Sequence, residues 1–274
     1  MKIKEYPPSL WRMVKLRLKM PSADGYHGQP NPNIIVSLTS IAPRLKHVHF
    51  AVLSILNQSI KPKKVILWLG EHCKDAIPPR LKQLIGPHFE IRFREDVGPH
   101  TKLIHSLSEF PDHIIVTCDD DLMYPADWLE RLMSAHQAFP SDIIGHQCRT
   151  IQFRDNGSPK PYKQWVDEAP GQSHDNTLPL GYGGVLYPVG SLPEITTNAD
   201  LFRKLAPKAD DLWFKAVSWH NGTRSRRSTE PSDKPYPIPF SQSVSLQKAN
   251  VKGDANRDQW INLAKHFNLP PLKS

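Results

Sequence analysis

Short runs of β-branched and aliphatic residues alternate with segments of helical periodicity along the first 150 residues of this 274-residue chain. The runs that predict strands are 34–36, 65–69, 89–93, 114–118 and 143–144. Between them, the spacing and caps predict helices carrying Leu45, Val48, Val52 and Ile55, then over 75–85, then from a Thr101 cap through Leu103, Ile104 and Leu107, then from Pro125 through Trp128, Leu129 and Leu132. This alternation predicts an α/β fold with a mainly parallel sheet and helices on both faces.

Beyond residue 150 the periodicity weakens. Residues 154–180 and 221–240 are rich in Pro, Gly, Ser and charge, which predicts two long surface loops. A glycine-rich strand is expected over 181–187, and a helix is expected to begin at Asp210 or Asp211. A last amphipathic helix is predicted from Asp254 or Asn256 to Phe267, and its expected buried residues are Trp260, Ile261, Leu263 and Ala264.

Three consecutive aspartates, Asp119, Asp120 and Asp121, directly follow the fourth predicted strand. Ligands of open α/β sheets bind at the carboxyl ends of the strands. Three carboxylates at that position repel one another unless a cation or a basic side chain neutralises them. The triplet therefore predicts a divalent metal site, with an acidic helix cap ahead of Pro125 as the alternative.

Net charge and cysteine content limit the location and the partners of the chain. The net charge is +8, which predicts attraction to nucleic acid, anionic lipid or phosphorylated substrates. There is no apolar run of the ~20 residues that a membrane span needs, and no secretory signal pattern, so a cytoplasmic location is expected. Three widely spaced cysteines are typical of reduced thiols.

The first 20 residues hold six basic residues and one acidic residue, a net charge of +5. Leu10, Trp11, Val14 and Leu18 can share one face of a helix that carries basic residues opposite, although Arg17 falls on the wrong face. This pattern is typical of a helix lying on an anionic membrane, which would place the protein peripherally on the inner face. A solvated or packed terminal helix is the alternative.

An ordered set of motifs carries a resemblance to a known family. In chain order the motifs are IIVSLTSIAPRL, SILNQS, GPHTKL, IIVTCDDDLMYPADWLERL, GYGGVLYP and ADDLWF. The chain resembles the nucleotide-sugar-dependent glycosyltransferases of the GT-A fold, especially bacterial enzymes that build surface polysaccharides, over roughly residues 33–220. It departs from many relatives after the second strand, where Trp68, Leu69, Gly70 and Glu71 replace an aspartate that often contacts the nucleobase.

The resemblance implies a metal-assisted donor site. Asp119–Asp121 matches the DxD motif, which implies Mn²⁺ or Mg²⁺ bridging the two phosphates of the donor. The implied metal ligands are Asp119, Asp121 and His220, with Asp121 ranked first. The residues predicted to hold the nucleotide sugar are Thr39, Arg44, Lys102, Asp119, Asp120, Gly183 and Gly184. For the two glycines a β-bulge is the alternative, and Arg224, Arg226 and Arg227 could close over the phosphates.

In inverting members of the family, a second acidic pair supplies the general base. Aligning ADDLWF with that pair implies that Asp211 is the base and that Asp210 is its neighbour or an acceptor ligand. Ordinary helix capping is the alternative reading of this pair.

The function expected from these features is metal-dependent, inverting transfer of a sugar to a glycan or lipid-linked acceptor. The implied organisation is a basic N-terminal segment (1–32), a GT-A catalytic domain (33–220), and a C-terminal loop and helix (221–274) packing on that domain. Two alternatives are a metal-dependent nucleotidyl- or phosphotransferase, which also clusters carboxylates at strand ends, and a basic nucleic-acid-binding module.

Overall fold

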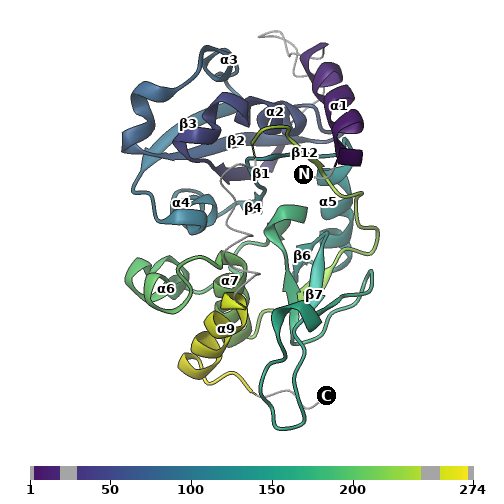
Figure 1. The fold of residues 1–274 in the computed structure, drawn as a ribbon, viewed down its shortest axis with the longest axis vertical. Coiled ribbons are helices and arrows are strands. Elements are labelled where there is room, and N and C mark those ends of the chain that lie inside the picture. The colour runs from purple at the N-terminus through teal and green to yellow at the C-terminus, as the bar shows by residue number, and fades with distance from the viewer. Residues whose placement is uncertain (1–2, 19–29, 242–253, 271–274) are drawn as a thin grey trace.

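A seven-stranded sheet forms the centre of the computed structural model, which describes residues 3–18, 30–241 and 254–270 (Figure 1). Its strands are β1 (Pro30–Thr39), β2 (Lys61–Gly70), β3 (Phe89–Arg94), β4 (Ile114–Thr117), β6 (Ile143–Gly145), β10 (Val185–Tyr187) and β11 (Ser225–Arg227). The spatial order is β11-β6-β10-β4-β1-β2-β3. Neighbouring strands are parallel except at β10, which runs antiparallel to both β4 and β6.

Helices cover both faces of this sheet. The described α-helices are α1 (Tyr6–Leu18), α2 (Leu45–Leu56), α3 (Pro79–Lys82), α4 (Thr101–Glu109), α5 (Trp128–Ala138), α6 (Ala199–Leu205), α7 (Asp210–His220) and α9 (Ala255–His266). Short 3₁₀ turns are η1 (Ile3–Glu5), η2 (Ala42–Arg44), η3 (Glu71–Ala76), η4 (Gly98–His100), η5 (Tyr162–Gln164), η6 (Gly181–Gly183) and η7 (Glu194–Thr197). Two small sheets pair β5 (Leu122–Met123) with β12 (Tyr236–Pro237), and β7 (Cys148–Thr150) with β8 (Val166–Asp167) and β9 (Thr177–Pro179).

The central strands are apolar on both faces because each face is covered. In β1, Ile34, Val36 and Leu38 point into the core formed with α2 and α5, whereas Ile35 points into the core formed with α4 and α7. Successive side chains of a strand point to opposite faces, so a continuous apolar run fills both layers. The mixed sheet with helices on both sides confirms the predicted α/β class.

The C-terminal half is more regular than its composition predicts. The two segments expected to be loops contain β8, β9, β11 and β12, and β11 pairs in parallel with β6 in the main sheet. The expected glycine-rich strand is split into the turn η6 and the short strand β10. The segment 75–85 forms only η3 and α3 rather than one helix. In α9, Trp260 and Leu263 are buried as expected, but Ile261 is exposed, so its predicted burial is wrong.

Helix starts also differ slightly from the predictions. Thr101 is the first residue of α4 rather than its cap, and its hydroxyl accepts a hydrogen bond from the Val97 amide at 3.0 Å. Helix α5 begins at Trp128, after the turn that holds Pro125. Among the described helices, none is both long enough and apolar enough to cross a membrane.

The turn before β10 depends on a glycine. Gly184 has a φ of +96°, and a Cβ built there would lie 2.4 Å from the Trp128 indole. Trp128 is fully buried and donates a hydrogen bond to the Gly183 carbonyl at 2.8 Å, so the ring cannot move aside easily. The Gly183–Gly184 segment is therefore shaped by close packing on this tryptophan.

Gly184→Ala is expected to destabilise the fold more than Gly190→Ala. Gly190 also has a positive φ (+71°), but a Cβ there would meet nothing within 4 Å. Backbone strain alone costs roughly 1–2 kcal/mol, and overpacking against Trp128 adds about 1–3 kcal/mol. Urea unfolding of both variants measures the difference, and equal losses would show that the contact with Trp128 is not limiting.

Candidate active site

The carboxyl ends of β1 and β4 bring the first acidic cluster to the edge of the sheet. The two strands are parallel neighbours in which Ser37 is paired with Thr117. The residues that follow them, Ser40 on one strand and Asp119–Asp121 on the other, therefore leave the sheet side by side. Helix α4 begins close to the same edge, and its first turn carries Lys102.

Lys102 joins the two predicted acidic clusters. Its Nζ lies 2.9 Å from Asp119 Oδ1 and 3.0 Å from Asp210 Oδ2. Burial opposes the charged form of this lysine, but the charges of Asp119, Asp210 and Asp211 outweigh it and raise its pKa well above the ordinary value. The structure thus places a permanent ammonium group between carboxylates that are about 90 residues apart in the chain.

Gly181 lies directly against this cluster. Its amide donates a hydrogen bond to Asp211 Oδ1 at 3.0 Å. A Cβ at this position would lie 2.7 Å from Lys102 Nζ and 2.8 Å from Asp211 Oδ1. A side chain here would displace the groups that form the site, so the glycine is required by the site itself. The glycine-rich motif is the signal for this residue, but nothing in the motif ranks Gly181 above Gly183 and Gly184.

The two aspartates at the start of α7 have different electrostatic environments. Burial raises the pKa of Asp210, but the charges of Lys102 and His100 and the hydrogen bond from Lys102 together outweigh it, so the net pKa is lowered. Burial and the charge of Asp210 raise the pKa of Asp211 to about 7. Asp211 is also more exposed than Asp210. Of the pair, Asp211 is therefore the carboxylate that can exchange a proton near neutral pH.

Arg44 holds the other two members of the triplet. Its guanidinium lies 2.6 Å from Asp120 Oδ1 and 3.6 Å from Asp121 Oδ2. The Ser40 hydroxyl donates to the second oxygen of Asp120 at 2.5 Å. The carboxylate of Asp120 is thus buried and held by Arg44 and Ser40, whereas the carboxylate of Asp119 faces Lys102. Burial and the charges of Asp120 and Asp119 raise the pKa of Asp121 to about 7.

The donor groups fit a hard divalent cation. Among the described residues, the ion pairs of these five aspartates involve two cations, Lys102 and Arg44. Burial and this excess of negative charge together raise the pKa of Asp121. No group of three or more His, Cys, Asp or Glu side chains converges within the described part of the chain. Mg²⁺-type sites at phosphates commonly use only one or two carboxylates together with phosphate oxygens and water, so Asp121 and Asp119 suit that role.

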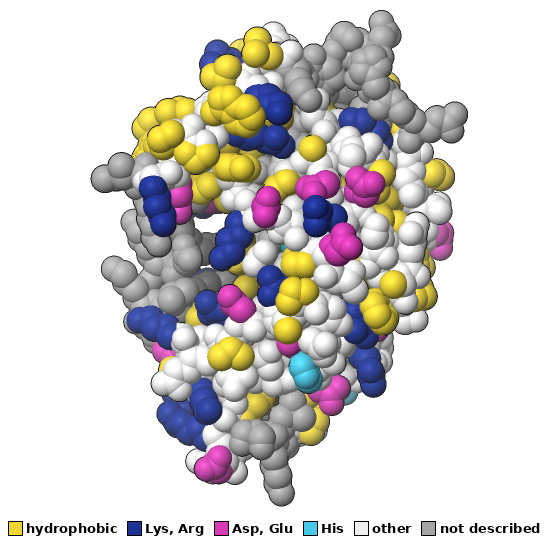
Figure 2. All heavy atoms as spheres, turned by 90° about the vertical axis from the view of Figure 1, so that its right-hand side faces the viewer, with side chains coloured by type: hydrophobic (Ala, Val, Ile, Leu, Met, Phe, Trp, Pro, Cys, Tyr) yellow, Lys and Arg dark blue, Asp and Glu magenta, His cyan; other side chains and the backbone are white. Residues whose placement is uncertain are grey.

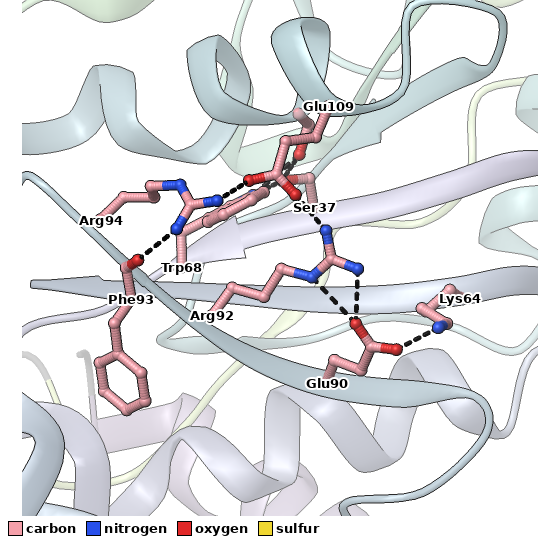
Figure 3. Close-up of polar contacts among 9 residues, drawn as sticks. Ser37, Lys64, Trp68, Glu90, Arg92, Phe93, Arg94 and Glu109 are labelled. Carbon is pink, nitrogen blue, oxygen red and sulfur yellow. Dashed lines mark hydrogen bonds and ion pairs between the residues drawn. The ribbon is translucent and has the colours of Figure 1, made fainter.

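Trp68 positions the first turn of α4. Its Nε1 donates to Ser37 Oγ at 3.1 Å, and the Ser37 hydroxyl in turn donates to the carbonyl of Lys102. Figure 3 shows Trp68 beside a charged network in which Arg92 bridges Glu90 and Glu109 and Arg94 binds Glu109. Trp68 is fully buried. Trp68, one of the four residues at the strand end where many relatives have an aspartate, is thus a structural support for Lys102.

Two further residues shape the site without having been predicted from the sequence. Ser40 binds Asp120, as described above, and Tyr124 accepts a hydrogen bond from the Asp119 amide at 2.8 Å. The Tyr124 hydroxyl also contacts the Tyr182 carbonyl at 3.2 Å. Nothing in their local sequence distinguishes them from ordinary core residues. Thr39, which was predicted, donates to the Trp68 carbonyl at 3.0 Å at the end of β1.

Other predicted site residues lie elsewhere or have other partners. His220 is the last residue of α7, about 15 Å along the helix from Asp210, so the structure does not bring it to the aspartates. A Cβ added at Gly183 would meet Gln147, and one added at Gly184 would meet Trp128.

The arginines of the 221–240 segment also have partners within the protein. Arg226 pairs with Asp142 at 2.7 Å and stacks on Phe139. Arg227 donates to the carbonyls of His146 and Glu168. Arg224 is exposed. Closure of Arg226 and Arg227 over a diphosphate would therefore require them to leave bonded positions.

The mainly parallel sheet with helices on both faces is the architecture of the GT-A nucleotide-sugar glycosyltransferases. The chain belongs to glycosyl transferase family 2, whose model matches residues 44–190, more than half of its length. Enzymes of this family use nucleotide-sugar donors and generally a divalent metal. This assignment favours glycosyl transfer over the nucleotidyltransferase and nucleic-acid-binding alternatives.

The solved structures that match this chain include the following two. Residues 1–349 of S. aureus TarS are 15% identical with a TM-score of 0.48, and the match covers 86% of this chain and 72% of that one. CMP:2-keto-3-deoxy-manno-octonic acid synthetase in complex with CTP is 10% identical with a TM-score of 0.40, covering 75% and 93%. No curated protein matches the chain.

Asp211→Asn is expected to stabilise the protein in a pH-dependent way. The folded pKa of about 7 lies above the ordinary unfolded value, so the folded state binds more protons and wild-type stability falls as pH rises from about 4 to 7. The amide can keep the bond from Gly181 while carrying no charge. The variant should therefore gain roughly 1–3 kcal/mol over wild type at pH 8 and little at pH 4.

Calorimetric melting at the two pH values measures this difference. Asp75→Asn, at an exposed aspartate outside the site, is the matched control. A gain for Asp211→Asn that is the same at both pH values would contradict the raised pKa.

Proposed function

We propose that the protein is a metal-dependent, inverting glycosyltransferase that moves a sugar from a nucleotide-sugar donor to a glycan or lipid-linked acceptor. Its expected setting is the assembly of bacterial surface polysaccharide on the cytoplasmic side of a membrane. The observation that carries the proposal is the position of Asp211. Its carboxylate accepts a hydrogen bond from the Gly181 amide, its neighbour Asp210 is joined by Lys102 to Asp119 of the triplet, and its pKa is close to neutrality.

The proposed step is a single displacement at the anomeric carbon. The acceptor oxygen forms a bond to that carbon, its proton passes to the carboxylate of Asp211, and the bond from the carbon to the diphosphate oxygen breaks. The diphosphate leaves with the electron pair of that bond. Because attack and departure occur on opposite sides of the carbon, the configuration inverts. One oxygen of Asp211 is held by the Gly181 amide, which leaves the other for the acceptor hydroxyl.

The remaining charged residues bind and orient the donor. Asp121 and Asp119 would hold Mn²⁺ or Mg²⁺, which when bound neutralises the charge that develops on the diphosphate. Lys102 uses two of its N–H groups on Asp119 and Asp210, and the third is available to a phosphate oxygen. Arg44 fixes Asp120 and lies beside Asp121, so it orders the triplet before the donor binds.

Asp211→Asn and Asp121→Ala are each expected to fold but to lose transfer. Loss of a general base lowers kcat by roughly 10²–10⁴-fold. Release of nucleoside diphosphate from a panel of nucleotide sugars measures turnover, with Asp75→Asn as the control. Wild-type turnover by either variant removes that residue from the mechanism, and release of pyrophosphate in place of nucleoside diphosphate identifies a nucleotidyltransferase.

Binding of the leaving nucleotide should depend on a divalent metal. UDP, GDP, ADP or dTDP, tested singly, should raise the melting temperature with Mn²⁺ present and much less with excess chelator, because ligand binding stabilises the folded state by mass action. The Asp121→Ala variant should lose the metal-dependent part of the shift. Equal shifts with and without Mn²⁺ would show that the triplet does not take a metal with the nucleotide.

A further inference from the structure

Helix α1 is attached to the protein by one face only. Ser9 and Leu16 are buried, and Arg12 donates to the Tyr124 carbonyl at 2.7 Å. These positions recur at helical spacing and form the face that contacts α2 and β12. The helix is therefore fixed in orientation, and its opposite face is defined.

That opposite face is apolar and exposed. Its residues and their exposed fractions are Leu10 (47%), Trp11 (63%), Val14 (56%) and Leu18 (83%). At about 100° of rotation per residue, the four side chains fall within one third of the helix circumference, roughly opposite Ser9 and Leu16. We refer to these four residues as the α1 stripe. Four large apolar side chains in one exposed row differ from the scattered apolar residues of an ordinary surface.

Basic side chains flank the α1 stripe on both sides. The Lys15 ammonium lies 4.9 Å from the centre of the Trp11 ring, and Arg17 lies on the other side of the stripe, over the Phe50 ring at 5.3 Å. Figure 2 shows hydrophobic side chains gathered with Lys and Arg at the upper end of this face of the molecule. Tryptophan with adjacent lysine and arginine is typical of helices at a membrane–water interface.

A small pocket lies between α1, α2 and α3. Its volume is about 210 Å³, and its lining residues are Arg17, His49, Leu53, Arg80, Gln83 and Leu84. This volume is below the ~300–1,000 Å³ typical of sites for drug-sized ligands, so it suits a single compact group. Arg17, the residue that breaks the amphipathic pattern of the helix in the sequence, is accounted for by its position in this pocket.

The polar groups of the pocket lack partners of opposite charge. Neither Arg17 nor Arg80 forms an ion pair with a carboxylate in the described ranges. His49 is buried, and both of its ring nitrogens are inaccessible to solvent. Burial lowers the pKa of His49 to about 4, with Arg80 and Arg17 acting in the same direction, so the imidazole is neutral and the positive charge of the pocket comes from the two arginines. Two guanidinium groups match the oxygens of a phosphate.

We propose that α1 docks the protein on a membrane that contains anionic phospholipid, with the α1 stripe inserted among the acyl chains and the pocket of Arg17, Arg80 and His49 occupied by a lipid phosphate. Arg17 flanks the α1 stripe and also lines the pocket, so the two features lie on neighbouring surfaces. A lipid is the ligand that presents an anionic oxygen group next to hydrocarbon, which meets both features together. A second copy of the chain would bring its own Arg17 and Arg80 against these arginines.

The docking surface is connected to the candidate active site. The carbonyl of Tyr124 accepts the bond from Arg12 of α1, and the hydroxyl of Tyr124 accepts the bond from the Asp119 amide. Arg12 lies on the attached face of α1, opposite the α1 stripe. A membrane bound to the stripe would therefore lie on the far side of α1 from Tyr124. The proposal itself does not depend on sugar transfer, because the stripe and the pocket contain none of the residues assigned to the reaction.

Vesicle flotation of the purified full chain tests the proposal. Wild type should bind vesicles of phosphatidylcholine with phosphatidylglycerol and not vesicles of phosphatidylcholine alone. Trp11→Ser/Leu18→Ser removes apolar burial and Arg17→Gln/Arg80→Gln removes the phosphate donors. Each pair should weaken binding by at least about tenfold. All four residues are exposed or line an open pocket, so folding should persist.

Matched variants separate the specific surface from general charge and hydrophobicity. Val189→Ser removes an exposed apolar residue elsewhere, and Arg154→Gln/Arg224→Gln removes two exposed arginines elsewhere. Both should bind vesicles like wild type. Transfer to a soluble acceptor should be unchanged in the Trp11→Ser/Leu18→Ser variant, which distinguishes failure of docking from failure of the proposed reaction.

Three results would overturn the proposal. The first is that wild type does not bind anionic vesicles. This includes the case in which it binds soluble glycerol 3-phosphate tightly but does not bind vesicles. The second is equal weakening by the Arg154/Arg224 and Arg17/Arg80 pairs, which would indicate a net-charge effect. The third is a wild-type dimer in solution that Trp11→Ser/Leu18→Ser converts to monomer, which would identify a second copy as the partner of the stripe.

Discussion

The ion pairs of Lys102 are the interaction on which the arrangement of the site depends. A single buried ammonium group bonds to Asp119, from the end of β4, and to Asp210, from the start of α7. Breaking a buried pair leaves an uncompensated charge, which typically costs about 3–5 kcal/mol. The lysine therefore fixes the distance between the carboxylates proposed for donor binding and the carboxylate proposed as the base. Trp68 and Ser37 support it from behind through the Lys102 carbonyl.

The aspartates around this lysine differ in their cationic partners and in their pKa values. Asp210 and Asp120 each have a close cationic partner, whereas Asp121 and Asp211 have pKa values of about 7. The paired carboxylates give the site a fixed geometry. Burial also raises the pKa of Asp120 despite its bonds to Arg44 and Ser40. Asp121 and Asp211, whose pKa values reach about 7, are the residues proposed to bind the metal and to act as the base. Structural and chemical roles are thus divided between neighbouring residues in each acidic group.

Sequence reasoning was most successful where the information is local. The β-branched runs predicted β1 to β4 and β6 because strands buried on both faces need continuous apolar residues. The prediction of a loop over 221–240 missed β11, because this short polar segment forms a strand only by pairing with the distant β6. For the site, the two acidic groups were visible as motifs, and their link through Lys102 was not. The role of each glycine in the GYGG motif depends on the side chain that lies against it. That side chain is Lys102 for Gly181, Gln147 for Gly183 and Trp128 for Gly184, and the spacing of the motif does not predict these contacts.

The antiparallel strand β10 has a consequence for the order in which parts of the protein fold. It occupies the position between β4 and β6 and leads directly from the turn that carries Gly181. Because its partners are far away in the chain, its insertion requires the closure of long loops, which is slow relative to the local β1–α2–β2 pairing. The catalytic constellation would consequently be among the last parts of the molecule to form. A partly folded chain would then contain most of the parallel strands but no assembled active site.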